Sequence, residues 1–333
     1  MRKIIIYSLL LVILCFAIPA IFTKVFTSKE ASEPVNENEE IQSSIVEYNY
    51  KNYDTISLLH VKTGEIESLK LDEYLLGVVS AEMPADFEME ALKAQAVVAR
   101  TYTMYKIING NRKHGDADIC DDSTCCQAWI SKDDRLARWD EQKREENWNR
   151  IVVAVNSTAG KIITYNNQPI NAFFHSNSGG KTEMPINVWG GSGYPYLQSV
   201  ATSGEENYSQ YASEVEISKE ELIEKIKKRH SDIQIDWSKT DEVKILEYTD
   251  SGRVKTIKFG NTNLSGVEAR SLFGLKSTNF KVKVEENKIK FSVLGYGHGV
   301  GLSQTGSDSL AKQGQNYEEI IKHFYQGVEV INY

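Results

Sequence analysis

The spacing of apolar residues predicts two consecutive helices in the first third of the chain. Between Asp72 and Met83 the apolar residues recur at helical spacing, and Pro84 cannot continue the pattern. A second helix is predicted from about Glu88 to Ile107, with a broad face of small and apolar residues. Such a face lets neighbouring backbones approach closely, so we expect this helix to be central to the core.

The rest of the chain mixes predicted strands, helices and loops. Before residue 200 we expect a hairpin in 45–70, a charged helix over 133–149 that continues towards 158, strands in 161–176 with a turn at 166–167, and a Gly-rich loop at 177–196. After residue 200 we expect a helix over 218–230 and strands at 243–248, 254–259, 280–284 and 288–293. A Gly-rich run at 295–306 and helices over 307–312 and 317–324 complete the predicted elements. Because strands and helices do not alternate regularly, the pattern predicts an α+β fold with largely antiparallel sheets that form a cleft.

The N-terminus carries a targeting signal. Arg2 and Lys3 precede an uncharged run from Ile4 to Phe22, and about 20 apolar residues suffice to cross a membrane. A cleaved signal peptide is the alternative, but the run exceeds a usual signal core and no clear cleavage site follows it. We therefore expect residues 1–23 to be an uncleaved, single-pass signal anchor, with the N-terminus in the cytoplasm and the remainder exported.

Composition divides the exported part. Residues 24–44 are acidic, rich in Glu, Asn and Ser, and lack periodicity, which is typical of a flexible tether. We expect residues 45–333 to form the extracytoplasmic catalytic region, divisible into two lobes at about 45–200 and 201–333. The second of these is strand-rich.

The charge balance argues against one class of partner. The formal net charge is −8, and Arg2 and Lys3 are the only charges in the first 23 residues, so the rest of the chain carries −10. A general nucleic-acid binder needs a basic surface, so no nucleic-acid partner is expected. Polysaccharides remain candidates, because sugars are recognised mainly by hydrogen bonds and stacking.

Glu82 is an acid on an apolar helix face. It follows Val78 by four residues and Val79 by three, which places all three on one stripe of the predicted helix. A buried carboxyl group resists ionisation, and a carboxylic acid that stays protonated near neutral pH can act as a general acid. The alternatives are a side chain that reaches solvent beside Pro84 or a buried pair with Arg100.

Three motifs in order resemble one known family. Residues 80–84 (SAEMP) with 91–102 (ALKAQAVVARTY), residues 174–182 (FHSNSGGKT) and residues 295–306 (GYGHGVGLSQTG) are similar to the hallmarks of the stage II sporulation protein D family. The resemblance implies a lytic transglycosylase that cleaves the bond between N-acetylmuramic acid and N-acetylglucosamine in peptidoglycan strands without stem peptides. It also implies that Glu82 is the catalytic acid.

The resemblance further implies a setting and partners. Such proteins act in the mother-cell membrane, facing the forespore, during engulfment in endospore formation. They are expected to work beside the stage II sporulation membrane proteins P and M. Composition and spacing indicate none of this.

Two Gly-rich segments offer hydrogen-bonding side chains. We expect them to line a sugar-binding cleft around Glu82; two tight turns with satisfied histidines are the alternative. The predicted substrate-binding residues are Gln95, Arg100, His175, Ser176, Lys181, Tyr296, His298, Ser303 and Gln304.

A short loop holds four potential metal ligands: His114, Cys120, Cys125 and Cys126. Thiolate and imidazole suit tetrahedral zinc, and a site closed by four protein ligands is structural. The loop resembles that of clostridial-type relatives, which hold zinc through its His and Cys residues, and the resemblance implies these four ligands here. Such relatives more often carry His at the position of Cys125. A disulfide from Cys120 to Cys125 or Cys126 is the alternative in an exported domain.

Two other functions compete with the enzyme. The resembled family is similar to amidase enhancers, which would make the chain a non-catalytic glycan-binding protein. A zinc amidase using His175, His298 and a cysteine is the third hypothesis, ranked last because the two histidines lack metal-ligand spacing.

Overall fold

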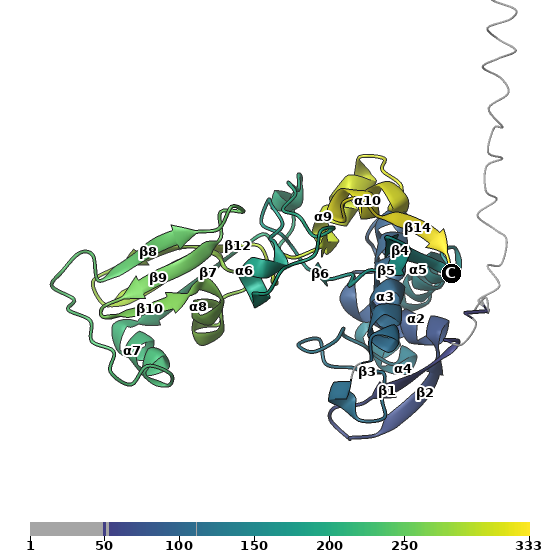
Figure 1. Cartoon of the computed structure of the whole chain (residues 1–333), viewed down its shortest axis with the longest axis horizontal. Coiled ribbons are helices and arrows are strands. Elements are labelled where there is room, and N and C mark those ends of the chain that lie inside the picture. The colour runs from purple at the N-terminus through teal and green to yellow at the C-terminus, as the bar shows by residue number, and fades with distance from the viewer. Residues whose placement is uncertain (1–48, 51–52, 111) are drawn as a thin grey trace, which may run out of the picture. The chain divides into compact units, whose positions relative to one another are not determined.

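A computed structural model describes residues 49–50, 53–110 and 112–333 (Figure 1). The predicted anchor at 1–23 and tether at 24–44 lie outside the described residues. Within the described part, no helix is both long and apolar enough to cross a membrane.

The first hydrophobic core surrounds the long helix α3 (Met89–Ile108), against which α2, α5, α9 and α10 pack. Its helical elements are α2 (Leu71–Glu82), η1 (Arg112–His114), α4 (Lys132–Arg138), α5 (Arg144–Asn156), α6 (Pro185–Trp189), η2 (Glu205–Asn207), α9 (Gln304–Lys312) and α10 (Tyr317–Phe324). The small residues of α3 are fully buried, which explains the close approach of its neighbours.

Short sheets border this core. In the first, β1 (Thr55–Leu59) pairs antiparallel with β2 (Ile66–Lys70) and parallel with β3 (Ile119–Cys120). In the second, β4 (Lys161–Tyr165) pairs antiparallel with β5 (Gln168–Pro169) and with β14 (Glu329–Asn332). A parallel pair, β6 (Phe174–His175) and β13 (Leu302–Ser303), joins the two Gly-rich motifs.

The second hydrophobic core lies between two antiparallel sheets and two helices. One sheet has the order β11 (Asn279–Val284), β12 (Lys288–Leu294), β7 (Ala212–Ser218); the other has the order β10 (Thr262–Ser265), β9 (Val254–Phe259), β8 (Val243–Tyr248). The helices are α7 (Lys219–Lys227) and α8 (Gly266–Phe273). Inward-facing aromatic residues fill the core; Phe273 stacks on Phe291 with ring centroids 5.1 Å apart.

The predicted α+β class is confirmed, since mixed helices and mainly antiparallel sheets form the fold. Interactions between residues close in sequence explain why α10 and the turn between β4 and β5 were predicted correctly. Asn316 caps α10 by accepting hydrogen bonds from the backbone N–H groups of Glu318 and Glu319. Asn166 and Asn167 adopt positive φ angles of 51° and 61° in the predicted turn between β4 and β5, as a two-residue hairpin requires.

The prediction of a continuous charged helix over 133–149 is wrong: the chain leaves the helix after Arg138 and re-enters it at Arg144, where α5 begins. In the intervening turn, the Asp140 carboxylate accepts a hydrogen bond from the Gln142 N–H, a local bond that competes with helix formation.

The division into two lobes at about residue 200 stays a prediction. Buried apolar residues of 201–333 belong to both hydrophobic cores, and those from Val300 onward belong to the first.

Candidate active site

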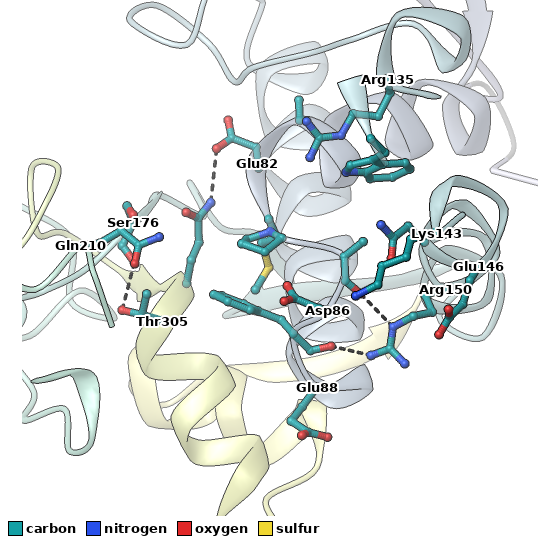
Figure 2. A pocket seen from close by; sticks show the side chains of 18 residues that line it. Glu82, Asp86, Glu88, Arg135, Lys143, Glu146, Arg150, Ser176, Gln210 and Thr305 are labelled. Atoms are coloured by element: carbon teal, nitrogen blue, oxygen red, sulfur yellow. Dashed lines mark hydrogen bonds between the residues drawn. The ribbon is translucent and has the colours of Figure 1, made fainter. Parts of the chain in front are cut away.

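Glu82 is the last residue of α2, and both of its carboxylate oxygens accept hydrogen bonds. The Ala128 N–H lies 2.7 Å from Oε1, and the Gln304 Nε2 lies 3.2 Å from Oε2 (Figure 2). Val78 and Val79 of the same helix face are fully buried, while Glu82 itself is partly buried. The carboxyl group is therefore fixed from two other segments of the chain.

Burial raises the pKa of Glu82 above its ordinary value, because a desolvated carboxyl group disfavours the charged form. The hydrogen bonds from Ala128 and Gln304 lower the pKa, but they do not overcome the effect of burial. This environment favours the protonated acid.

Glu82 lines a cavity of about 770 Å³ (Figure 2). The walls come from the end of α2 and the following turn, from α4 and α5 with the segment between them, and from the Gly-rich motifs. The lining residues are Ala81, Glu82, Met83, Pro84, Ala85, Asp86, Phe87, Glu88, Arg135, Trp139, Lys143, Glu146, Asn147, Arg150, Ser176, Gln210, Gln304 and Thr305. A cavity of this volume lies within the range of ligand-binding pockets.

The turn after α2 is held in place from both sides. Arg150 donates hydrogen bonds to the backbone carbonyls of Ala85, at 2.7 Å, and Phe87, at 2.6 Å. The Glu88 N–H donates to the Asp308 carboxylate at 2.6 Å. These bonds fix the floor of the cavity beside Glu82.

Ser176 and Gln304 are the predicted substrate-binding residues that line this cavity with Glu82. The Ser176 carbonyl accepts a hydrogen bond from the Thr305 N–H at 3.0 Å, which ties the two Gly-rich motifs together. The other predicted substrate-binding residues are not among those that line the cavity.

His175 is buried and His298 is partly buried, and the centroids of their rings lie 5.7 Å apart. Burial lowers the pKa of His175 to about 4 and that of His298 well below its ordinary value, so both are neutral at neutral pH. Both rings also hydrogen-bond the backbone of Val300. The His298 ring packs against the Trp189 ring, with centroids 5.1 Å apart, and Trp189 itself is largely exposed.

Gln95 and Arg100 do not line the cleft as predicted, because both side chains have 0 % exposure. Arg100 donates to the Thr158 carbonyl at 2.9 Å and pairs with Asp72 at 3.3 Å. It therefore has a structural role, and its partner is Asp72 rather than Glu82. The Gln95 amide is enclosed within the core without a protein hydrogen-bond partner.

Ser303 is also fully buried. Its hydroxyl caps α9 and donates to Glu205, a carboxylate that sequence reasoning missed. Glu205 also accepts hydrogen bonds from Ser178 and Thr202. Burial opposes ionisation of Glu205, but these bonds outweigh it and its pKa is lowered. Glu205 is one of two adjacent acids in a short polar stretch, and nothing in the sequence distinguishes it from Glu206.

Lys181 and Tyr296 lie outside the described cavity. Lys181 donates to the Asp250 carbonyl at 3.1 Å, a contact between segments of the two cores. Tyr296 is 44 % exposed, and the Lys276 Nζ lies 5.1 Å from its ring centroid. Neither contacts Glu82.

The predicted ligand loop brings its four side chains together. The donor atoms of His114, Cys120, Cys125 and Cys126 all lie within 4.8 Å of one another. The His114 Nε2 is 3.3 Å from the Cys126 Sγ and 3.6 Å from the Cys125 Sγ. Among the described residues, Cys120, Cys125 and Cys126 form no disulfide. One imidazole and three thiols around a common point are compatible with a metal site.

This cluster adjoins the acid through the backbone. Ala128, which donates to Glu82, follows Cys126 by two residues. The intervening Gln127 is buried and donates to the Tyr74 hydroxyl of α2 at 2.9 Å. The ligand loop and the acid therefore share one packed unit.

Sequence reasoning missed the wall opposite α2. Arg135, Trp139, Lys143 and Arg150 line the cavity from α4, α5 and the segment between them. A charged helix is usually a solvated surface, so the pattern gave no reason to select them. Only the break between α4 and α5 indicates that this stretch turns around a site.

The fold and the site define a class of protein: an α+β protein with one partly buried glutamic acid in a cavity, next to a His/Cys cluster. A family model described as stage II sporulation protein matches residues 60–165, and one described as a domain of unknown function matches residues 196–301. The chain is 34% identical over 277 residues to stage II sporulation protein D of Bacillus subtilis, covering 83% of this chain and 78% of that protein. The chain belongs to the stage II sporulation protein D family.

Two further relatives widen the comparison. An uncharacterized protein of Brachyspira hyodysenteriae is 30% identical, with 80% of this chain and 68% of that protein covered. A protein of Bacillus subtilis named amidase enhancer is 29% identical over 308 residues, with 78% of this chain but 40% of that protein covered.

Proposed function

We propose that this chain is a peptidoglycan lytic transglycosylase with Glu82 as its single catalytic acid and base. The observation that carries the proposal is the partly buried Glu82, whose pKa is raised by burial and which lines a cavity of about 770 Å³. The family's sporulation members support a role in cell-wall remodelling.

One carboxyl group suffices for the reaction. Protonated Glu82 donates its proton to the glycosidic oxygen, and the bond from that oxygen to C1 of N-acetylmuramic acid breaks. The C6 hydroxyl of the same sugar then bonds to C1, and its proton passes to the Glu82 carboxylate. The products are a 1,6-anhydro end and a free hydroxyl, and no water is consumed. The N–H donors of Ala128 and Gln304 stabilise the carboxylate between the two steps.

The His/Cys cluster fits zinc as a structural metal, held by His114, Cys120, Cys125 and Cys126. With four protein ligands it would brace the loop that carries the Ala128 N–H. No step of the reaction passes through it.

The cellular setting is part of the proposal. Residues 1–23 anchor the protein in the mother-cell membrane, and the remainder faces the forespore as an extracytoplasmic enzyme during engulfment. Glycan strands are its substrate, and the stage II membrane proteins P and M act beside it. The family membership and the basic, then apolar, N-terminal sequence support this setting.

The test is product analysis. Purified protein is incubated with glycan strands freed of stem peptides, and the products are analysed by mass spectrometry for 1,6-anhydro-muramic ends. Their formation is expected. Reducing ends instead would indicate hydrolysis, and no cleavage by folded protein would contradict the enzyme.

A second candidate function is that of a glycan-binding enhancer of a separate amidase, favoured by the 29% identity to the amidase enhancer. It requires no acid. Two results together would favour this candidate. Wild type would form no anhydro product, and the Glu82→Gln variant would stimulate the amidase as well as wild type does.

A further inference from the structure

The α4–α5 wall of the cavity carries three cations without carboxylate partners among the described residues. They are Arg135, Lys143 and Arg150. Arg150 is committed to backbone carbonyls, as described above. Arg135 is different, because within the described part of the chain its guanidinium forms neither an ion pair nor a hydrogen bond.

Arg135 is held by packing. Its Cζ lies 4.6 Å from the ring centroid of Trp139, and its Nε is buried without a hydrogen-bond partner. Stacking on an aromatic ring orients the planar guanidinium and leaves its terminal N–H groups free for a ligand. A fixed guanidinium of this kind matches the two oxygens of a carboxylate.

The position of Arg135 relates it to the reaction. In Figure 2, Arg135 and Glu82 lie toward one end of the cavity and Glu88 lies toward the other. Asp86, Glu88 and Glu146 also line the cavity, so its charge is mixed. Recognition of an anion there depends on the placement of Arg135 rather than on a general positive potential.

The substrate chemistry supplies a matching anion. Each N-acetylmuramic residue carries a lactyl group, which ends in a free carboxylate when the stem peptide is absent and in an amide when it is present. We propose that Arg135 binds the lactyl carboxylate of the muramic residue next to Glu82, so that the cavity selects strands without stem peptides. This inference rests on the proposed function and deepens it.

The test compares two forms of one substrate. Short glycan strands freed of stem peptides are used as such or after conversion of their lactyl carboxylates to primary amides. A charge-assisted bidentate pair is stronger than a neutral one, so we expect wild type to prefer the carboxylate form by about tenfold in KM, with kcat little changed. Arg135→Gln should bring this ratio close to one by raising KM for the carboxylate form.

The control variant is Arg138→Gln, which changes an exposed arginine of the same helix outside this cavity. It should keep the wild-type ratio. Arg135→Lys, which keeps the charge but lacks the planar fork, should give an intermediate ratio. A wild-type ratio in both Arg135 variants, or no preference in wild type, would overturn the proposal.

Binding measurements test the Arg135 subsite independently of the proposed lytic activity. In the Glu82→Gln background, the Kd of each glycan form is measured by calorimetry, with and without Arg135→Gln. A carboxylate preference that depends on Arg135 supports the subsite even if wild type cleaves nothing. Cleavage without such a preference rejects the subsite and leaves the lytic reaction standing.

Discussion

At the scale of single residues, the environment of Glu82 sets two opposing effects against each other. Burial disfavours the carboxylate, while the N–H groups of Ala128 and Gln304 favour it, and burial prevails. The helical spacing from Val78 and Val79 was enough to select Glu82 from the sequence. Its hydrogen-bond partners were not predictable, because they are 46 and 222 residues away along the chain.

Glu82→Gln keeps the size of the side chain but cannot transfer a proton. We expect the rate of glycan cleavage to fall by about 10²–10⁴-fold, the usual contribution of general acid–base catalysis, while glycan binding persists. Anhydro-product formation and calorimetric binding check the two parts. Cleavage at the wild-type rate would remove Glu82 from the mechanism.

The same variant should change how stability depends on pH. Since the pKa of Glu82 is raised in the folded state, its contribution to stability is fully present below its unfolded pKa and is lost as pH rises through the folded pKa. Wild type should therefore lose stability relative to Glu82→Gln between acidic and neutral pH. Denaturant unfolding of both proteins across this range measures the difference. A constant difference would show that burial does not shift this pKa.

At the scale of elements, α2 and the loop at 128–130 form one packed unit. A Cβ at Gly77 would lie 2.2 Å from the Trp129 Nε1 and 2.8 Å from the Ile130 carbonyl oxygen. The sequence predicted the helix, but its contact with Trp129 and Ile130 depends on the missing side chain at Gly77, which no periodicity indicates.

Gly77→Ala tests this contact. Relief from glycine in a helix would stabilise by about 1 kcal/mol, whereas overpacking costs about 1–3 kcal/mol. Because one of the clashes is with backbone, we expect net destabilisation and reduced activity through displacement of the Ala128 N–H. Denaturant unfolding and product formation measure both effects. A gain in stability would show that residues 128–130 can move to accommodate the added methyl group at little cost.

The proposed structural zinc predicts that the stability of the ligand loop depends on a bound metal ion. Cys126→Ser removes one thiolate ligand, so we expect weaker zinc binding and a lower Tm, since metal binding is coupled to folding. Ser123→Ala, at an exposed position of the same loop, is the control and should leave both unchanged. Metal analysis, thiol titration and thermal unfolding check this. Protein with no zinc and two fewer free thiols would establish the disulfide alternative instead.

At the scale of the whole molecule, two polar residues join distant segments. Arg253, which directly precedes β9, donates to the carbonyls of Ser178 at 2.7 Å and Lys181 at 3.1 Å. Glu205 joins Ser178 to Ser303, which are 27 and 98 residues away from it. Both Gly-rich motifs are thus positioned by buried charges outside the motifs.

Glu205→Gln should therefore destabilise the fold, by about 2–4 kcal/mol, since a buried anion with several donors is replaced by a neutral amide. The exposed neighbour Glu206 provides the control, Glu206→Gln, which should have little effect. Because the pKa of Glu205 is lowered, its stabilisation is present above its unfolded pKa and is lost as pH falls through the folded pKa. Equal stability of the two variants at neutral pH would contradict this role.

The sequence by itself determined the α+β class, the position of α2 to within one residue at each end, both ends of α10, the turn at Asn166–Asn167, the proximity of the four metal-type ligands and the unusual position of Glu82. These features depend on periodicity, capping and turn chemistry, which act over a few residues. Only the tertiary structure decided that Arg100 pairs with Asp72, that the α4–α5 break lines the cavity, and that residues 300–331 return to the first core. Those outcomes depend on packing between segments far apart in the chain, where many pairings share the same local pattern.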